Sequence, residues 1–162
     1  MDDPIQYARA PSDLLAYGDA AGMTGLAILR GMIEGRHAAA PMAALMGIGL
    51  VAAEEGVVRF RGTPRFDHVN PMGTVHGGWY GALLDSAMGC AVMSVMPAGG
   101  AYTTLEYKVN LVRAAPLDRE VECTATIDHA GRSTAAARAE IRGVADGRLH
   151  ATGSTTCLVL RR

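Results

Sequence analysis

A single carboxylate, Asp85, lies in the middle of a long apolar segment. The nearest charged residue before it is Asp67, and no charge follows over residues 86–105. A charged side chain inside an apolar helix is costly unless it is paired or used in function. The adjacent glycines Gly77 and Gly78 offer backbone N–H groups that a ligand can approach closely. A carboxylate near bare amides at the start of a helix is what acyl-transfer chemistry needs.

The composition predicts one globular domain. The chain has 162 residues, of which 49% are apolar and 19% charged, and these values exclude a disordered chain. A net charge of −1 gives no reason to expect a nucleic-acid partner. The three cysteines, Cys90, Cys123 and Cys157, lack metal-ligand spacing, and the histidines form no HExxH or Cys/His cluster. We therefore expect buried thiols and no metal site.

The N-terminus and the two long uncharged runs of the chain predict a cytoplasmic protein. The N-terminus is acidic and no apolar run follows it, so we expect no secretory signal. Two long uncharged runs, residues 38–53 and 86–105, are interrupted by proline and glycine. An unbroken membrane helix needs about 20 apolar residues, so both runs are expected in a protein core and no membrane contact is expected.

The hydrophobic period predicts an α+β fold. The expected elements are a helix over 14–34, a linker over 35–41, a hairpin of strands from 44 to 61 with a turn at Glu54-Glu55-Gly56, a helix over 78–96, and strands over 102–113, 120–129, 134–142 and 149–160. The second helix is apolar nearly all round and must be buried on most sides. We expect a curved antiparallel sheet wrapped around this one long helix. An N-terminal helical extension, residues 1–40, would precede this domain, residues 41–162.

One motif makes the chain resemble a known family. The segment reads Asn70-Pro-x-Gly73-x-Val-His76-Gly77-Gly78, followed by Leu84-Asp85-x-Ala87-x-Gly89-x-Ala91. Together with residues 103–110 and 131–133, it resembles the PaaI-like hotdog-fold thioesterases over residues 45–160. The resemblance implies hydrolysis of acyl-CoA thioesters, with coenzyme A as part of the substrate and no further cofactor. It also implies a homodimer with sites between two subunits, assembling as a dimer of dimers, a homotetramer.

The resemblance also implies roles for the residues around the acid. Asp85 matches the carboxylate that acts as general base or as nucleophile. The N–H of Gly78, or of Gly77, matches the donor that polarises the thioester carbonyl. Asn70 matches the amide that helps to place substrate or water, and His76 matches a histidine that mainly holds the turn before the helix.

The downstream motifs would complete the substrate site. Thr103 and Thr104 match strand positions that face the acyl group from the partner subunit. Arg132 and Ser133 lie in the turn that approaches the nucleotide end of coenzyme A in this family, where a guanidinium would pair with phosphate. Gly89 departs from the family pattern, which often has Ser or Thr at this position, and its small size leaves a bay beside Asp85.

Two other functions are compatible with the same residues. A non-catalytic acyl-CoA-binding hotdog module would explain the missing hydroxyl at Gly89. A hotdog hydratase or dehydratase acting on enoyl thioesters would use His76 and Asp85 as a histidine–acid pair.

Overall fold

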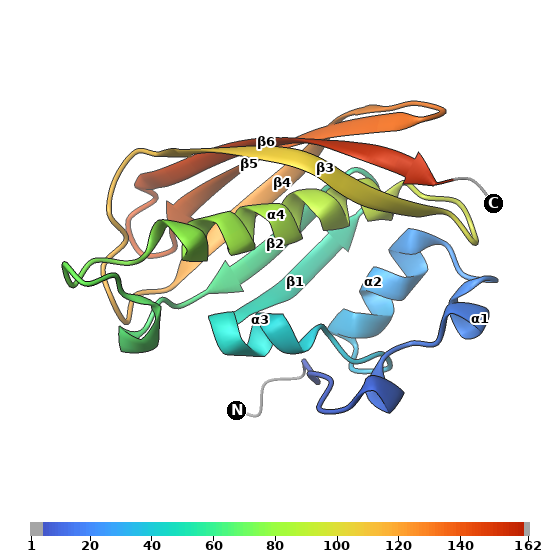
Figure 1. Ribbon diagram of the computed structural model, residues 1–162, viewed down its shortest axis with the longest axis horizontal. Coiled ribbons are helices and arrows are strands. Elements are labelled where there is room, and N and C mark those ends of the chain that lie inside the picture. Colours follow the sequence, from blue (N-terminus) through green and yellow to red (C-terminus); the bar gives the residue numbers. More distant parts are fainter. Residues whose placement is uncertain (1–4, 161–162) are drawn as a thin grey trace.

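A six-stranded antiparallel sheet curls around one long helix in the computed structural model, which describes residues 5–160 (Figure 1). Residues 1–4 of the predicted extension therefore lie outside the described residues. The central helix is α4 (Gly77–Ser94), and the strand order is β1-β2-β4-β5-β6-β3. The strands are β1 (Ile48–Glu54), β2 (Val57–Gly62), β3 (Ala101–Leu111), β4 (Val121–Ala130), β5 (Thr134–Gly143) and β6 (Leu149–Leu160). This confirms the predicted hotdog architecture, with two strands before the helix and four after it.

The central helix is held by hydrogen bonds from three of its own side chains. The Trp79 indole donates to the Met46 carbonyl over 2.8 Å, and the Tyr80 hydroxyl accepts the Ala115 N–H over 2.7 Å. At the other end, the Ser94 hydroxyl accepts the Gly56 N–H over 2.9 Å. Because buried polar groups must be paired, these bonds fix the position of α4 along its axis, in addition to its apolar packing. No helix within residues 5–160 is long and apolar enough to cross a bilayer.

Alternating side chains of β4 and β5 form the concave face that packs against α4. Val121, Cys123 and Ala125 of β4 are buried, and so are the alternate alanines and Ile141 of β5. The predicted strand over residues 134–142 is confirmed, although its alanines favour a helix, because the period of two matches a half-buried strand. Burial on the sheet therefore overrides local propensity here.

A β-bulge at Leu105 changes which side chains of β3 face α4. Thr104 pairs with Cys157 and Glu106 with Thr156, so Leu105 is the extra residue of the ladder. The Thr155 hydroxyl donates to the Glu106 carbonyl over 2.6 Å and holds the bulge. Because a bulge adds one residue, positions on its two sides reach the same face at odd spacing.

The predicted single helix over residues 14–34 is wrong. The chain forms two helices, α1 (Tyr17–Ala20) and α2 (Gly25–Ile33), after a 3-10 turn, η1 (Pro11–Asp13). The break occurs where the Thr24 hydroxyl caps α2 by accepting the Ala27 N–H over 3.2 Å. A capping residue inside an apparently periodic stretch therefore starts a new helix.

The predicted onset of a strand near residue 44 is also wrong. Residues of the predicted linker and hairpin instead form α3 (Pro41–Met46), and β1 begins only at Ile48. Proline is favoured at the first position of a helix, and Gly47 ends α3 in the left-handed region with φ of 61°. A second 3-10 turn, η2 (Phe66–His68), precedes the loop into α4.

Helix α2 of the extension contacts α4 directly near its C-terminal end (Figure 1). The Gly25 N–H donates to the Met96 carbonyl over 3.1 Å. A Cβ on Gly25 would lie 1.8 Å from the Met93 carbonyl oxygen. Only a glycine therefore allows α2 to approach this closely.

We expect Gly25→Ala to lower the free energy of unfolding by about 1–3 kcal/mol, because overpacking displaces α2 from α4. The matched control is Gly22→Ala, since a Cβ there meets no atom within 4 Å. Urea unfolding of both variants measures the difference. Equal effects of the two substitutions would contradict the close approach of α2 to α4.

Candidate active site

One face of α4, formed by Gly77, Gly81, Asp85 and Gly89, lies against the edge strand β3. Added Cβ atoms on Gly77, Gly81 and Gly89 would lie 3.5, 3.2 and 2.7 Å from the side chains of Leu111, Tyr107 and Tyr102, respectively. Asp85 occupies the remaining position, and Thr104 lies opposite it. Residues four apart share one helix face, so α4 presents three glycines and one carboxylate to β3. The small residues let the strand approach the acid closely.

Asp85 is half-buried and has one hydrogen-bond donor from β3. The Thr104 hydroxyl donates to Asp85 Oδ1 over 3.2 Å. Within residues 5–160 no lysine, arginine or histidine forms a salt bridge with this carboxylate. A half-buried acid without a cationic partner is free to accept a proton or to attack an electrophile.

Two neighbours of Asp85 stay neutral at physiological pH. Burial, with a smaller effect of the Asp85 carboxylate, raises the pKa of Cys90 to about 12. Burial also raises the pKa of Tyr102 well above its ordinary value, and nearby Cys90, Cys157 and Asp85 add to the effect. Cys90, which is half-buried and not fully buried as predicted, is therefore a neutral thiol and not a thiolate nucleophile, whereas Cys123 and Cys157 are buried.

The start of α4 is capped by the side chain of His76. The Gly78 N–H donates to His76 Nδ1 over 2.8 Å, so the proton of this imidazole is on Nε2. The Gly77 N–H, in contrast, has no acceptor among the described residues. Of the two predicted oxyanion donors, Gly77 is thus open to a ligand, while Gly78 must first exchange its partner.

Asn70 organises the loop that leads into α4. Its Oδ1 accepts the N–H groups of Met72 and Thr74 over 2.9 and 3.2 Å, and its Nδ2 donates to the Thr74 hydroxyl over 2.8 Å. Its backbone carbonyl accepts the N–H of Gly73, whose φ is 79°. The Asn70 amide therefore maintains a tight turn, and one N–H of its Nδ2 remains for another partner.

Some predicted site residues lie apart from Asp85 within one chain. Thr103 is exposed and points to the face of β3 opposite Thr104, because neighbouring strand residues alternate. Arg132 and Ser133 are exposed in the β4–β5 turn, which lies near the C-terminal end of α4. The Ser133 carbonyl accepts the Val159 N–H over 2.9 Å. Gly77 and Gly78 thus lie at the N-terminal end of α4, whereas Arg132 lies near its C-terminal end.

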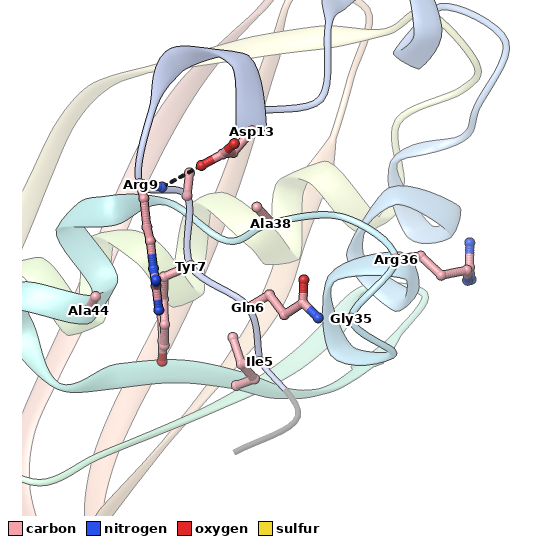
Figure 2. A pocket seen from close by; sticks show the side chains of 10 residues that line it. Ile5, Gln6, Tyr7, Arg9, Asp13, Gly35, Arg36, Ala38 and Ala44 are labelled. Atoms are coloured by element: carbon pink, nitrogen blue, oxygen red, sulfur yellow. Dashed lines mark hydrogen bonds between the residues drawn. The ribbon is translucent and has the colours of Figure 1, made fainter. Parts of the chain in front are cut away.

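A hollow of about 930 Å³ on the extension is separate from this arrangement. Ile5, Gln6, Tyr7 and Arg9 line it together with residues of the α2–α3 connection, and no residue of α4 lines it. Figure 2 shows Arg9 and Arg36 on opposite sides of the hollow, and Arg36 pairs with Glu34 outside it. Its charged groups do not converge on one point.

A metal centre is not formed by the described part of the chain. Within residues 5–160, no group of three or more His, Cys, Asp or Glu residues could hold an ion.

Sequence reasoning missed the tyrosines over the glycine positions of α4. Tyr102 and Tyr107 belong to a predicted strand, but their common orientation toward α4 depends on the bulge at Leu105. A strict period of two places these tyrosines on opposite faces, so the alternation of the sequence alone gives no signal for the pair.

Comparisons with known proteins agree with this architecture. Residues 72–149 match the Thioesterase superfamily. A conserved protein of Pseudomonas aeruginosa is 34% identical, with a TM-score of 0.69 and coverage of 74% of this chain and 94% of that one. A mutant of the phenylacetic acid degradation protein PaaI from Thermus thermophilus is 28% identical, with a TM-score of 0.68 and coverage of 74% and 99%.

A third structure shares the fold at lower identity. A hypothetical thioesterase protein of Streptococcus pneumoniae, with coenzyme A, is 24% identical, with a TM-score of 0.65 and coverage of 71% of this chain and 87% of that one. The comparison with curated proteins finds no match.

We expect His76→Ala to lower the free energy of unfolding by about 1 kcal/mol, because α4 loses its N-cap. His76→Ser retains an acceptor for the Gly78 N–H, so it should restore most of this stability. Denaturant unfolding of both variants measures the effect. Equal destabilisation by alanine and serine would contradict a capping role.

Proposed function

Since the chain belongs to the thioesterase superfamily and has the hotdog fold of the PaaI-like thioesterases, we propose that this thioester hydrolase cleaves acyl-CoA thioesters to the free acid and coenzyme A. Coenzyme A accompanies the Streptococcus pneumoniae protein of the same fold, which supports a CoA thioester as the substrate. The single observation that carries the proposal is the Asp85 carboxylate, which has no cationic partner within residues 5–160 and lies on an otherwise uncharged helix.

Asp85 can start the reaction by either of two routes, general-base catalysis or nucleophilic attack. As general base it takes a proton from water, whose oxygen attacks the thioester carbonyl carbon; the C–S bond then breaks, and the proton passes to the departing CoA thiolate. As nucleophile it attacks the carbonyl itself, releases the thiolate and forms a mixed anhydride, which water hydrolyses. Thr104 orients the carboxylate in both routes through its hydrogen bond to Oδ1.

The helix start of one protomer would supply the donors for the oxyanion that forms at Asp85 of the other, because Gly77 and Asp85 of one chain are about 12 Å apart along α4. Gly77 N–H has no acceptor among the described residues, and Gly78 N–H joins it when it leaves His76 Nδ1. The positive end of the α4 dipole favours negative charge at the same place. The loss of one such donor typically costs about 10²–10³ in turnover.

Edge strand β3 supports assembly through a second copy of the chain. It is the last strand of the sheet, and Leu105, Tyr107 and Leu111 on it are 57%, 46% and 56% exposed. A long edge strand with exposed apolar side chains invites pairing with another strand. We propose a homodimer in which two β3 strands pair antiparallel; the further pairing of dimers into a tetramer stays a prediction.

Antiparallel pairing would also explain the separated site residues. It places the C-terminal end of one α4 alongside the N-terminal end of the other, because the two-fold axis reverses direction. Arg132 of one protomer would thereby approach Gly77 and Gly78 of its partner. An exposed guanidinium at that place can pair with the phosphates of coenzyme A.

Asp85→Asn should reduce kcat/KM for acyl-CoA hydrolysis by at least about 10²–10⁴, because an amide neither accepts the proton nor attacks the carbonyl. Thiol release, followed with a thiol-reactive dye, measures the rate. The control is Asp67→Asn, an exposed carboxylate in η2, which should leave the rate unchanged. Saturable acyl-CoA binding without thiol release in the unaltered protein would instead select the non-catalytic binding module.

Mixing Asp85→Asn and Gly77→Pro protomers tests the shared site, because proline is tolerated at the first helical position but lacks the N–H donor. If each site combines Asp85 of one chain with the Gly77 N–H of the other, roughly one site in four of the mixture is intact, since half of the dimers are mixed. Hydrolysis at low substrate should then exceed the mean of the two separate variants. No gain after subunit exchange would contradict the antiparallel arrangement and leave the role of Asp85 untouched.

A further inference from the structure

Tyr102 of the edge strand β3 places its hydroxyl on the face of α4 that carries Asp85. The hydroxyl oxygen lies 2.7 Å from the position that a Cβ on Gly89 would occupy. Gly89 follows Asp85 by one helical turn, so the two residues are neighbours on that face. The absence of a side chain at position 89 therefore admits the phenol next to the acid.

The Tyr102 hydroxyl forms no hydrogen bond to any residue within 5–160, although the residue is half-buried. A tyrosine withdrawn from solvent usually pairs its hydroxyl, as Tyr80 does with the Ala115 N–H. The Tyr102 oxygen is still open to water, because the one unpaired and fully buried side-chain N or O atom in the described part of the chain is His37 Nε2. A water molecule can therefore reach this free hydroxyl.

The Tyr102 hydroxyl and the Asp85 carboxylate are complementary groups. Burial raises the pKa of Tyr102 well above its ordinary value, and Cys90, Cys157 and Asp85 raise it further. The phenol consequently keeps its proton and can donate a hydrogen bond, whereas a carboxylate only accepts them. A donor and an acceptor thus lie side by side on this face of the helix.

The spacing of the two groups suits one bridging water. Thr104 donates to Asp85 Oδ1, and Oδ2 has no partner among the described residues. Cβ positions one turn apart on a helix are separated by about 5–6 Å. Two successive hydrogen bonds through a water oxygen, of about 2.8 Å each, span the same distance.

We propose that Tyr102 is a further catalytic residue, whose hydroxyl holds the attacking water against Asp85. The water oxygen accepts the phenol O–H, and the water donates one hydrogen to Asp85 Oδ2, so that one lone pair remains for attack on the thioester carbonyl carbon. Asp85 then takes that proton, the C–S bond breaks and the proton passes to the departing thiolate, while Tyr102 keeps its own proton. This arrangement favours the general-base route, and it rests on the proposed function because it needs a thioester beside Asp85.

The test compares two tyrosines that differ in the partner of their hydroxyl. Tyr102→Phe removes a hydroxyl that has no partner in the chain, and the matched control Tyr80→Phe removes one that accepts the Ala115 N–H. Thiol release from acetyl-, hexanoyl-, decanoyl- and benzoyl-CoA gives kcat, and urea unfolding gives the midpoint of each variant. Calorimetry gives the Kd of the fastest of these thioesters in an Asp85→Asn background, where hydrolysis does not consume it.

We expect Tyr102→Phe to lower kcat about ten- to a hundredfold and to leave the Kd and the urea midpoint unchanged, because only the attacking water loses a partner. Tyr80→Phe should retain kcat and lower the urea midpoint, because the Ala115 N–H loses its acceptor. An unchanged kcat in Tyr102→Phe, a weaker Kd or a lowered midpoint would overturn the inference alone. The absence of thiol release from all four thioesters by the unaltered protein would overturn the proposed function.

Discussion

The close approach of α4 to β3 is the constraint on which the site depends. A strand can lie this near a helix only where the facing side chains are minimal, and α4 meets the requirement with Gly77, Gly81 and Gly89. The same approach brings the Thr104 hydroxyl to Asp85. A half-buried carboxylate in an apolar helix is stabilised by such a donor, because apolar side chains cannot replace the water that it loses on burial. The same face of α4 therefore carries both the glycines that allow close packing against β3 and the Asp85 carboxylate.

Most of the fold could be predicted from the sequence because its elements obey simple periods. The burial of α4 followed from the lack of a polar face, and β5 followed from alternation despite its alanines. The errors fall in residues 14–47, where short helices end and begin within a few residues. There Thr24, Pro41 and Gly47 decide the boundaries through capping and backbone geometry, and apolar periodicity is a weaker signal.

The residues of the candidate site could be named from the sequence, but their geometry could not. Asp85 and the glycines before it were evident from charge and spacing alone. The partner of the Gly78 N–H was not, because a histidine cap depends on a backbone conformation that the sequence does not display. The orientation of Tyr102 and Tyr107 depends likewise on a bulge, and a bulge has no reliable signature in a single sequence. Local hydrogen bonding thus determines the geometry of the site, which the hydrophobic periodicity of the sequence does not predict.

The bulge at Leu105 makes the length of β3 as important as its composition. Tyr102 and Thr104 before the bulge share a face with Tyr107 and Leu111 after it, across an odd spacing, because the bulge absorbs one residue. If the bulge straightened at the same strand length, regular alternation would turn one half of the strand over. Either the residues that contact the acid or the residues that cover the helix start would then point to solvent. Deleting Leu105, in contrast, would leave an even spacing, so both groups would keep their common face in a regular strand.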